Sequence, residues 1–238
     1  MVQVTFDGPV LEKPKTLRIC FRKTGALRYI SHLDLMRTMT RVIARVHLPI
    51  KYTCGFHPIP HLVFSAPLPV GAESPREFLD IAVLRELDPA DVVALLNDGL
   101  PEGLAVEKAY FAETKLQAIA AAEYTISIHT PSASPEVAAF CGSLLQEKPI
   151  VVLKHTKSGD KDVDISPAIL GVESGFDERE GDIVLRIRLR ADSGSFLNPD
   201  YLLRYLSSQT GILQGSPLEE WYAVVRTHLY NENGQDFC

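Results

Sequence analysis

The order of apolar and polar positions in the first half of the chain predicts alternating strands and helices. Two helices have start signals, because Ser31 and Asp88 stand at N-cap positions and Pro89 follows at a first helical position. The predicted elements are a strand at Leu17–Lys23, a helix from Ser31 that stops at His47–Pro49, strands at His61–Ala66 and Glu77–Leu84, a helix from Asp88 to about Asn97, and a strand at Leu104–Glu113. This βαββαβ order is typical of a ferredoxin-like domain.

The second half repeats the same order of elements. The pattern predicts a strand at Glu123–His129, a helix at Ser134–Gln146, a hairpin whose sides Ile150–His155 and Val163–Ile165 flank a turn-rich tip, a strand at Asp182–Arg190, a helix from Asn198 to near Gly211, and a strand at Glu220–Leu229. The fold class predicted is therefore α+β, with two tandem ferredoxin-like domains. The predicted division is a flexible lead-in at residues 1–16, a first domain at 17–113, a linker at 114–122 and a second domain at 123–238.

The first predicted helix has two distinct faces. Its apolar positions form one stripe, and Arg37, Arg41 and Arg45 fall on one ridge of the opposite side, about 6 Å apart along the axis. Such a ladder suits a row of phosphates, although a solvated helix face has the same composition. Asp34 can pair with Arg37 or Arg41 and weaken the ladder.

The start of this helix is a candidate anion site. Free backbone N–H groups and the positive end of the helix dipole favour a phosphate there, and Arg28, Ser31 and His32 are its sequence neighbours. Tyr29, Tyr52 and Phe56 interleave aromatic rings with this charge, which predicts base stacking.

Charge is distributed unevenly along the chain. Residues 1–61 hold ten Lys or Arg against three Asp or Glu, whereas residues 62–238 hold 14 against 27, and the net charge of the whole is −6. A basic segment in an acidic protein points to a polyanionic partner such as RNA. It can equally dock on the acidic remainder or on an acidic protein. A second, smaller basic patch is the predicted turn that carries Lys154, Lys157 and Lys161, beside several aspartates.

Three histidines are candidates for chemistry. His32 and His57 can act as general acid and base in metal-independent RNA cleavage. Cys54, His57 and His61 lie within eight residues and can supply metal ligands, although that spacing is commonplace. His32 can also serve only to order the helix start. The sequence therefore leaves catalysis open.

Absent patterns exclude several function classes. The chain has no P-loop, no dinucleotide-binding glycine motif, no nucleophile elbow and no HExxH. Its four cysteines form no CxxC pair, so a structural zinc site or a radical SAM cluster held by this chain is disfavoured, and no cofactor is predicted. No signal-like start and no run near 18 apolar residues occurs, which predicts a cytoplasmic protein without a membrane partner.

Four motifs carry a family resemblance. They are SHLDLMR at Ser31–Arg37, GFHPxP at Gly55–Pro60, SAPLPVG at Ser65–Gly71 and KHTKSGDKDVDI at Lys154–Ile165. Together they resemble the bacterial family DUF2344, also called radical SAM-linked protein. In the second motif this chain has Ile59 where family members commonly have histidine. The resemblance implies a radical SAM protein as partner and a setting of RNA processing.

Three functional hypotheses follow. The first is a non-catalytic RNA-binding or substrate-presenting protein that works with a radical SAM enzyme. The second is an RNA endonuclease or RNA-modifying enzyme that uses His32 and His57, by analogy with RNA-cleaving proteins built from tandem ferredoxin-like domains. The third is a protein-docking module that binds no nucleic acid.

Overall fold

The computed structural model describes residues 6–156, 159–192 and 196–238. The chain forms two compact units, unit 1 at Met1–Ala118 and unit 2 at Ile119–Cys238, and each combines helices with antiparallel strands. The boundary between the units falls inside the segment that the sequence predicts as a linker. No helix in the described ranges is long and apolar enough to cross a membrane.

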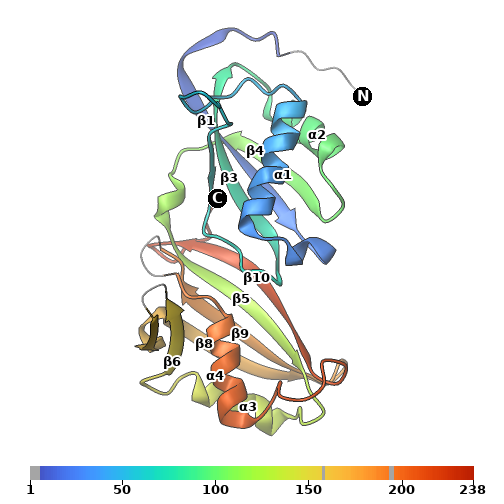
Figure 1. Cartoon of the computed structure of the whole chain (residues 1–238), viewed down its shortest axis with the longest axis vertical. Helices are drawn as coiled ribbons and strands as arrows, with labels where there is room; N and C mark the ends of the chain where they lie inside the picture. Colours follow the sequence, from blue (N-terminus) through green and yellow to red (C-terminus); the bar gives the residue numbers. More distant parts are fainter. Residues whose placement is uncertain (1–5, 157–158, 193–195) are drawn as a thin grey trace. The chain divides into compact units, whose positions relative to one another are not determined.

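Unit 1 is a sheet with two helices on one face (Figure 1). Its strands lie in the order β4-β1-β3, with β2 pairing on β3, and all these pairs are antiparallel. In chain order its elements are β1 (Val10–Lys23), the 3-10 turn η1 (Gly25–Tyr29), α1 (His32–Arg45), β2 (Leu62–Phe64), β3 (Ala72–Arg85), α2 (Pro89–Gly99), β4 (Leu104–Phe111) and the 3-10 turn η2 (Leu116–Ala118).

The core of unit 1 follows from two periodicities. Leu17, Ile19 and Phe21 alternate along β1, and all three are fully buried. Helix α1 contributes its predicted apolar stripe, of which Met39 and Ile43 are almost wholly buried. Burial of this stripe turns the polar ridge of α1 outward.

Two strands of unit 1 are longer than the sequence predicts. Strand β1 begins at Val10, so residues 10–16 are not a flexible lead-in: Val10 pairs with Arg85 and Lys15 with Val83. A register shift between Val10 and Lys15 accommodates Pro14. Strand β3 begins at Ala72, and Pro75 lies exposed near a second register shift. Prolines mark these strands as loops in sequence, but local irregularities of pairing tolerate them.

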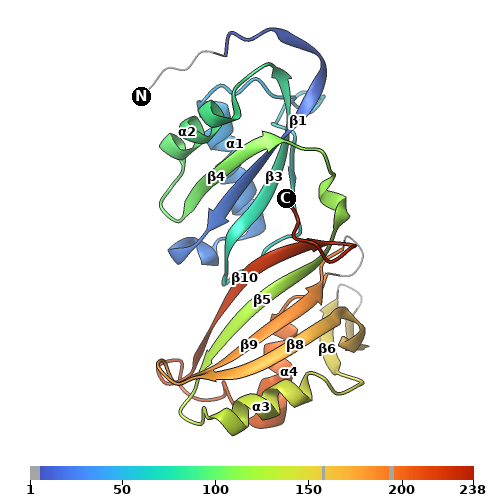
Figure 2. The ribbon, with the colours of Figure 1, turned by 180° about the vertical axis from the view of Figure 1, so that it is seen from behind.

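Unit 2 is a second helix-covered sheet. Its strands lie in the order β10-β5-β9-β8, and β6 and β7 form a separate two-stranded ribbon. The elements are β5 (Ile119–His129), α3 (Pro135–Leu144), β6 (Val151–Thr156), β7 (Gly159–Asp164), the 3-10 turn η3 (Ser166–Ala168), β8 (Ile169–Asp177), β9 (Asp182–Arg190), α4 (Asp200–Thr210) and β10 (Trp221–Asn231). Figure 2 shows this sheet in front of α3 and α4, so one face of it is not covered by the helices.

Strand β8 is absent from the sequence prediction. Its segment contains Gly171 and Gly175 and has a weak strand signal. The strand forms because it pairs with β9, for example Val172 with Ile187, and because α3 packs beside it. Long-range pairing therefore overrides a poor local preference.

Close approach of α3 to β8 gives a stability prediction. A methyl group at Gly142 would collide with the Cβ and Oγ atoms of Ser174. Gly142→Ala should lower the free energy of unfolding by about 1–2 kcal/mol, because this overpacking exceeds the helix preference of alanine over glycine. Chemical denaturation measures the change. Combining Gly142→Ala with Ser174→Gly should cost less than the two single changes added together, and simple additivity would contradict the contact.

Candidate nucleic-acid interface

The start of α1 is capped by its own side chains. The Oγ of Ser31 accepts a hydrogen bond from the backbone N–H of Asp34 at 3.1 Å and donates one to the Asp34 carboxylate at 2.7 Å. The bond that Ser31 donates to this carboxylate, and then the bond from Arg37, hold the pKa of Asp34 below its usual value. Since Asp34 is ionised there, a phosphate at the first turn would meet a negative charge. Ser31 thus caps the helix by satisfying one backbone N–H group of the predicted anion site, that of Asp34.

The arginine ridge of α1 faces outward. Arg37 forms an ion pair with Asp34 at 3.2 Å, but both side chains are more than half exposed, so the pair is weak and exchangeable. Arg41 and Arg45 are exposed and have no ion-pair partner among the described residues. Within the part of the chain that the structure describes, two unpaired guanidinium groups and one loosely paired group therefore line this ridge.

Much of the remaining positive charge in residues 1–61 is compensated internally. Arg18 and Lys23 are buried. Arg22 pairs with Glu107 at 3.5 Å, and Arg28 pairs with Glu73 at 3.2 Å. Together with Arg37, these residues make up half of the ten cations in residues 1–61. The amino-acid composition therefore overstates the positive charge that this segment presents to a ligand.

The 3-10 turn η1 presents Tyr29 on the surface. Buried Lys23 donates hydrogen bonds to the carbonyl oxygens of Leu27 and Arg28. The carbonyl oxygen of Arg28 also accepts a hydrogen bond from the backbone N–H of Gly71 at 2.8 Å. The Arg28 guanidinium lies 4.9 Å from the centroid of the Tyr29 ring, which is 63% exposed. These hydrogen bonds hold the turn in place, and the turn therefore presents an exposed aromatic ring at a defined position.

The two catalytic candidates lie in different surroundings. His32 places its ring edge-on against Phe64 of β2, with centroids 5.3 Å apart, so it helps to pack the start of α1 on the sheet. His57 is exposed in the loop that precedes β2. His32 therefore has a packing role.

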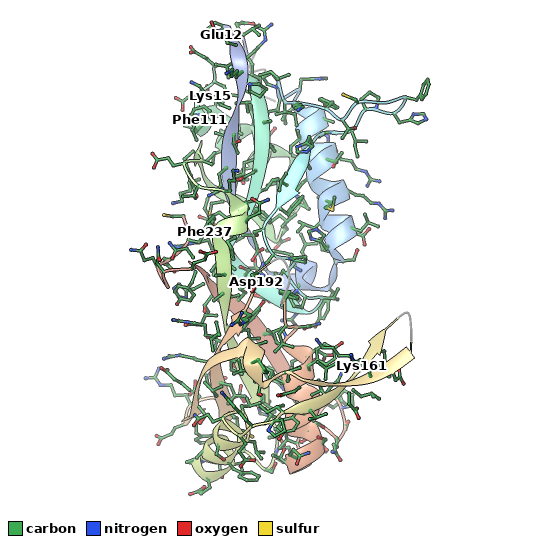
Figure 3. All side chains as sticks on the ribbon, turned by 90° about the vertical axis from the view of Figure 1, so that its left-hand side faces the viewer. Glu12, Lys15, Phe111, Lys161, Asp192 and Phe237 are labelled. Atoms are coloured by element: carbon green, nitrogen blue, oxygen red, sulfur yellow. The ribbon has the colours of Figure 1, made fainter. Side chains whose placement is uncertain are left out.

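The proline-rich loop at residues 51–61 projects past α1 (Figure 3). Thr53 and Ile59 bond across it, and the backbone N–H of His61 donates to the carbonyl of Lys51 at 3.0 Å. Predicted site residues Tyr52, Cys54, Phe56, His57 and His61 are all exposed. Within the described ranges no three His, Cys, Asp or Glu side chains are grouped so that they could hold a metal ion. Cys54, His57 and His61 are therefore not assembled as a ligand set.

The ribbon of β6 and β7 separates its charges by face. Lys154 and Lys161 are cross-strand partners, whereas Asp160, Asp162 and Asp164 lie at alternating positions on the other face. Lys154 lies 5.1 Å from the centroid of the Tyr201 ring of α4, and Lys161 projects from β7 (Figure 3). Lys157, also predicted for this patch, lies outside the described residues.

A further set of arginines has no role in the sequence prediction. Strand β9 was predicted with its observed bounds, and its alternation buries Ile183, Leu185, Ile187 and Leu189. The same alternation places Arg186, Arg188 and Arg190 together on the opposite face. The sequence signal that could have identified this set is the recurrence of arginine at every second position of the strand.

Comparisons with known proteins complete the description of the site. A "Crystal Structure of a Cbf5-Nop10-Gar1 Complex" contains a chain that is similar to 90% of this one at 12% identity, with a TM-score of 0.45, and this chain spans 50% of it. A "Crystal Structure of an Unknown Protein from Galdieria sulphuraria" is similar over 89% of this chain and 98% of that one, at 10% identity and a TM-score of 0.26. No curated protein matches. The sequence model of the family described as "Uncharacterized protein conserved in bacteria (DUF2344)" matches residues 16–199, well over half of the chain, and the chain therefore belongs to this family.

Proposed function

We propose that the protein is a non-catalytic RNA-binding or substrate-presenting accessory protein that works with a radical SAM enzyme in the modification or processing of RNA. The observation that carries RNA binding is the outward ridge of α1, where Arg41 and Arg45 are exposed and unpaired among the described residues. The radical SAM partner rests on the motif resemblance at Ser31–Arg37 and Gly55–Pro60.

The ridge has the chemistry of a phosphate contact. Successive arginines four residues apart are about 6 Å apart along the axis, and guanidinium groups bind phosphate oxygens through paired N–H donors. Arg37 can exchange its exposed bond to Asp34 for a phosphate at small cost. Tyr29, beside Arg28, supplies an exposed ring for a base.

We also propose that both units are ferredoxin-like. Support comes from the βαββαβ element order in unit 1 and from the same order in unit 2 with the β6–β7 ribbon inserted after α3. The strand orders are equivalent, because in each unit the first strand lies between the last and the third, and the second strand lies outside the third. Such domains place helices on one face and leave the other face of the sheet for ligands.

Protein docking is the second candidate function. The proline-rich loop carries Phe56 at its tip with its whole surface exposed (102%), and Ile59 is also exposed. Fully exposed aromatic side chains on a hydrogen-bonded loop are typical of contacts with protein partners. In the accessory role, this loop would contact the radical SAM enzyme.

Binding of a bacterial tRNA mixture by the purified chain, measured by filter retention at increasing salt, tests the proposal. We expect retention at low salt, a slope of log K against log salt of about −0.7 to −0.9 for each phosphate neutralised, and intact RNA on a denaturing gel. Absence of retention at low salt would contradict RNA binding and favour docking. Cleavage that is lost in His57→Ala would instead support the endonuclease hypothesis.

A further inference from the structure

The helix-free face of the unit 2 sheet, here called the open face, gathers aromatic rings and arginines. Strands β10, β5 and β9 contribute alternate residues to it, and α3 and α4 cover the opposite face (Figure 2). Strand β10 contributes Trp221, Ala223, Val225, His228 and Tyr230 to this face. Next to it, β5 contributes His129, Ser127, Thr125 and Glu123. Strand β9 then contributes Val184, Arg186, Arg188 and Arg190. Its centre is mixed, because Thr125 and Ser127 of β5 lie beside Val225 and Ala223 of β10, and so it differs from the wholly apolar core of a permanent protein interface.

One end of the open face carries a fixed aromatic stack. The His129 and Trp221 rings are nearly parallel, at 16°, with centroids 5.2 Å apart, and Trp221 is 47% exposed. The Nδ1 atom of His129 lies 2.8 Å from the carboxylate of Asp182, which is almost completely buried. Because Asp182 holds the imidazole in place, the stack needs little ordering before a flat ligand adds to it.

The other end carries a second ring cluster. Tyr230 stacks with His228 at 5.8 Å, and the Arg188 guanidinium lies 4.1 Å from the Tyr230 centroid. Glu123 accepts hydrogen bonds from the Tyr230 hydroxyl at 3.1 Å and from Arg188 at 3.2 Å. The charges of Glu123 and Arg188 therefore offset each other, and their bonds orient the tyrosine ring.

Two arginines between and beside these clusters are available for phosphates. Arg186 and Arg190 are exposed and have no ion pair among the described residues. With Arg188 they follow every second position of β9, about 6.6 Å apart. Glu173 of β8 is the cross-strand partner of Arg186, and the acidic side chains Glu173, Asp177 and Glu178 line one hollow together with Arg186 on the β8 side of the face. A polyanion is therefore directed to the β9, β5 and β10 side of the face.

We infer that the open face binds single-stranded RNA, with a base stacked on the His129–Trp221 pair, a second base at the Tyr230 cluster, and phosphates at Arg186 and Arg190. The exposed Trp221 ring and the half-buried Tyr230 ring lie beside cations on a four-stranded sheet, which suits unpaired bases, whose faces stack whatever their identity. The inference rests on the proposed RNA binding. It deepens that proposal, because it adds a second base-binding surface, apart from the α1 ridge and Tyr29, that takes unpaired nucleotides of the RNA.

Trp221 provides a direct test, because it is the only tryptophan in the chain. The full chain is titrated with an oligouridylate of about 15 nucleotides, near the upper limit of sites on single-strand-binding folds. We expect saturable quenching of tryptophan fluorescence that weakens with salt. In polarisation measurements with labelled oligouridylate, Trp221→Ala and the pair Arg186→Ala with Arg190→Ala should each weaken binding by about tenfold or more. Tyr222→Ala is the matched control, because Tyr222 is equally exposed at the next position of the same strand.

The outcomes separate this inference from the proposed function. If oligouridylate binds but tryptophan fluorescence and the affinity of Trp221→Ala do not change, the open face is not the site and the α1 ridge still can be. If no RNA binds at all, both proposals are overturned. Equal or tighter binding of an oligodeoxythymidylate of the same length would overturn the assignment to RNA, since the 2′-hydroxyl is what distinguishes the two.

Discussion

Replacing Asp80 by alanine should lower the free energy of unfolding by about 3–5 kcal/mol. Asp80 on β3 binds Arg18 on β1 through two bonds, at 2.7 and 2.9 Å, and the Arg18 side chain has no exposed surface. Without Asp80 a buried guanidinium loses its counter-charge, whereas its bonds to Thr114 remain. Chemical denaturation of the full chain measures the loss.

Two comparisons make this prediction specific. Glu107→Ala removes the partner of Arg22 in a pair that is about half exposed, and it should cost less than about 1 kcal/mol. Arg18→Met combined with Asp80→Ala should recover most of the stability, because no unpaired charge is then buried. Equal costs for Asp80→Ala and Glu107→Ala would show that Arg18 is solvated and would contradict the prediction.

Reversing two charges on the α1 ridge should nearly abolish RNA binding. In the double variant Arg41→Glu and Arg45→Glu, each site loses a charge-assisted bond to phosphate and gains repulsion. We expect tRNA affinity at low salt to fall by about a hundredfold or more, since each such bond contributes about 1.5–3 kcal/mol. The slope of log K against log salt should become shallower by about 1.4–1.8, because two phosphate contacts are lost.

A second double variant controls for net charge. Lys13→Glu with Lys15→Glu changes the charge by the same amount on β1, and Lys15 lies on the side of unit 1 away from α1 (Figure 3). This control should lose much less affinity than the ridge variant. Equal losses would mean that RNA responds to overall charge, and the ridge would then not be the binding surface.

Local signals predict the elements best where they are strong. The cap at Ser31 and the apolar stripe of α1 predict a helix that the structure has at His32–Arg45, and the alternation of β9 predicts its observed bounds. Strand β8 and the first part of β1 are missed, because glycines and prolines weaken their local pattern. These segments become strands through pairing with residues far along the chain.

The candidate site shows the same division. Sequence alone places Arg37, Arg41 and Arg45 on one ridge, since helical geometry fixes their spacing. It does not reveal that Arg28 forms an ion pair with Glu73, because that pair joins residues 45 positions apart. Nor does composition reveal that Arg186 and Arg190 share a face with Trp221, because this requires strand β9 to lie next to β5 and β5 next to β10.

The sequence by itself determined the helices and the strands whose local pattern is strong, the side of each of these elements that is apolar, and therefore that Arg37, Arg41 and Arg45 face outward from α1. These properties depend on neighbours within a few positions and on the fixed periods of helix and strand. Only the tertiary structure decided which of those cations keep their charge free and which aromatic rings lie beside them. Ion pairs and stacked rings form between distant segments, so their energy depends on the order of strands and not on local spacing.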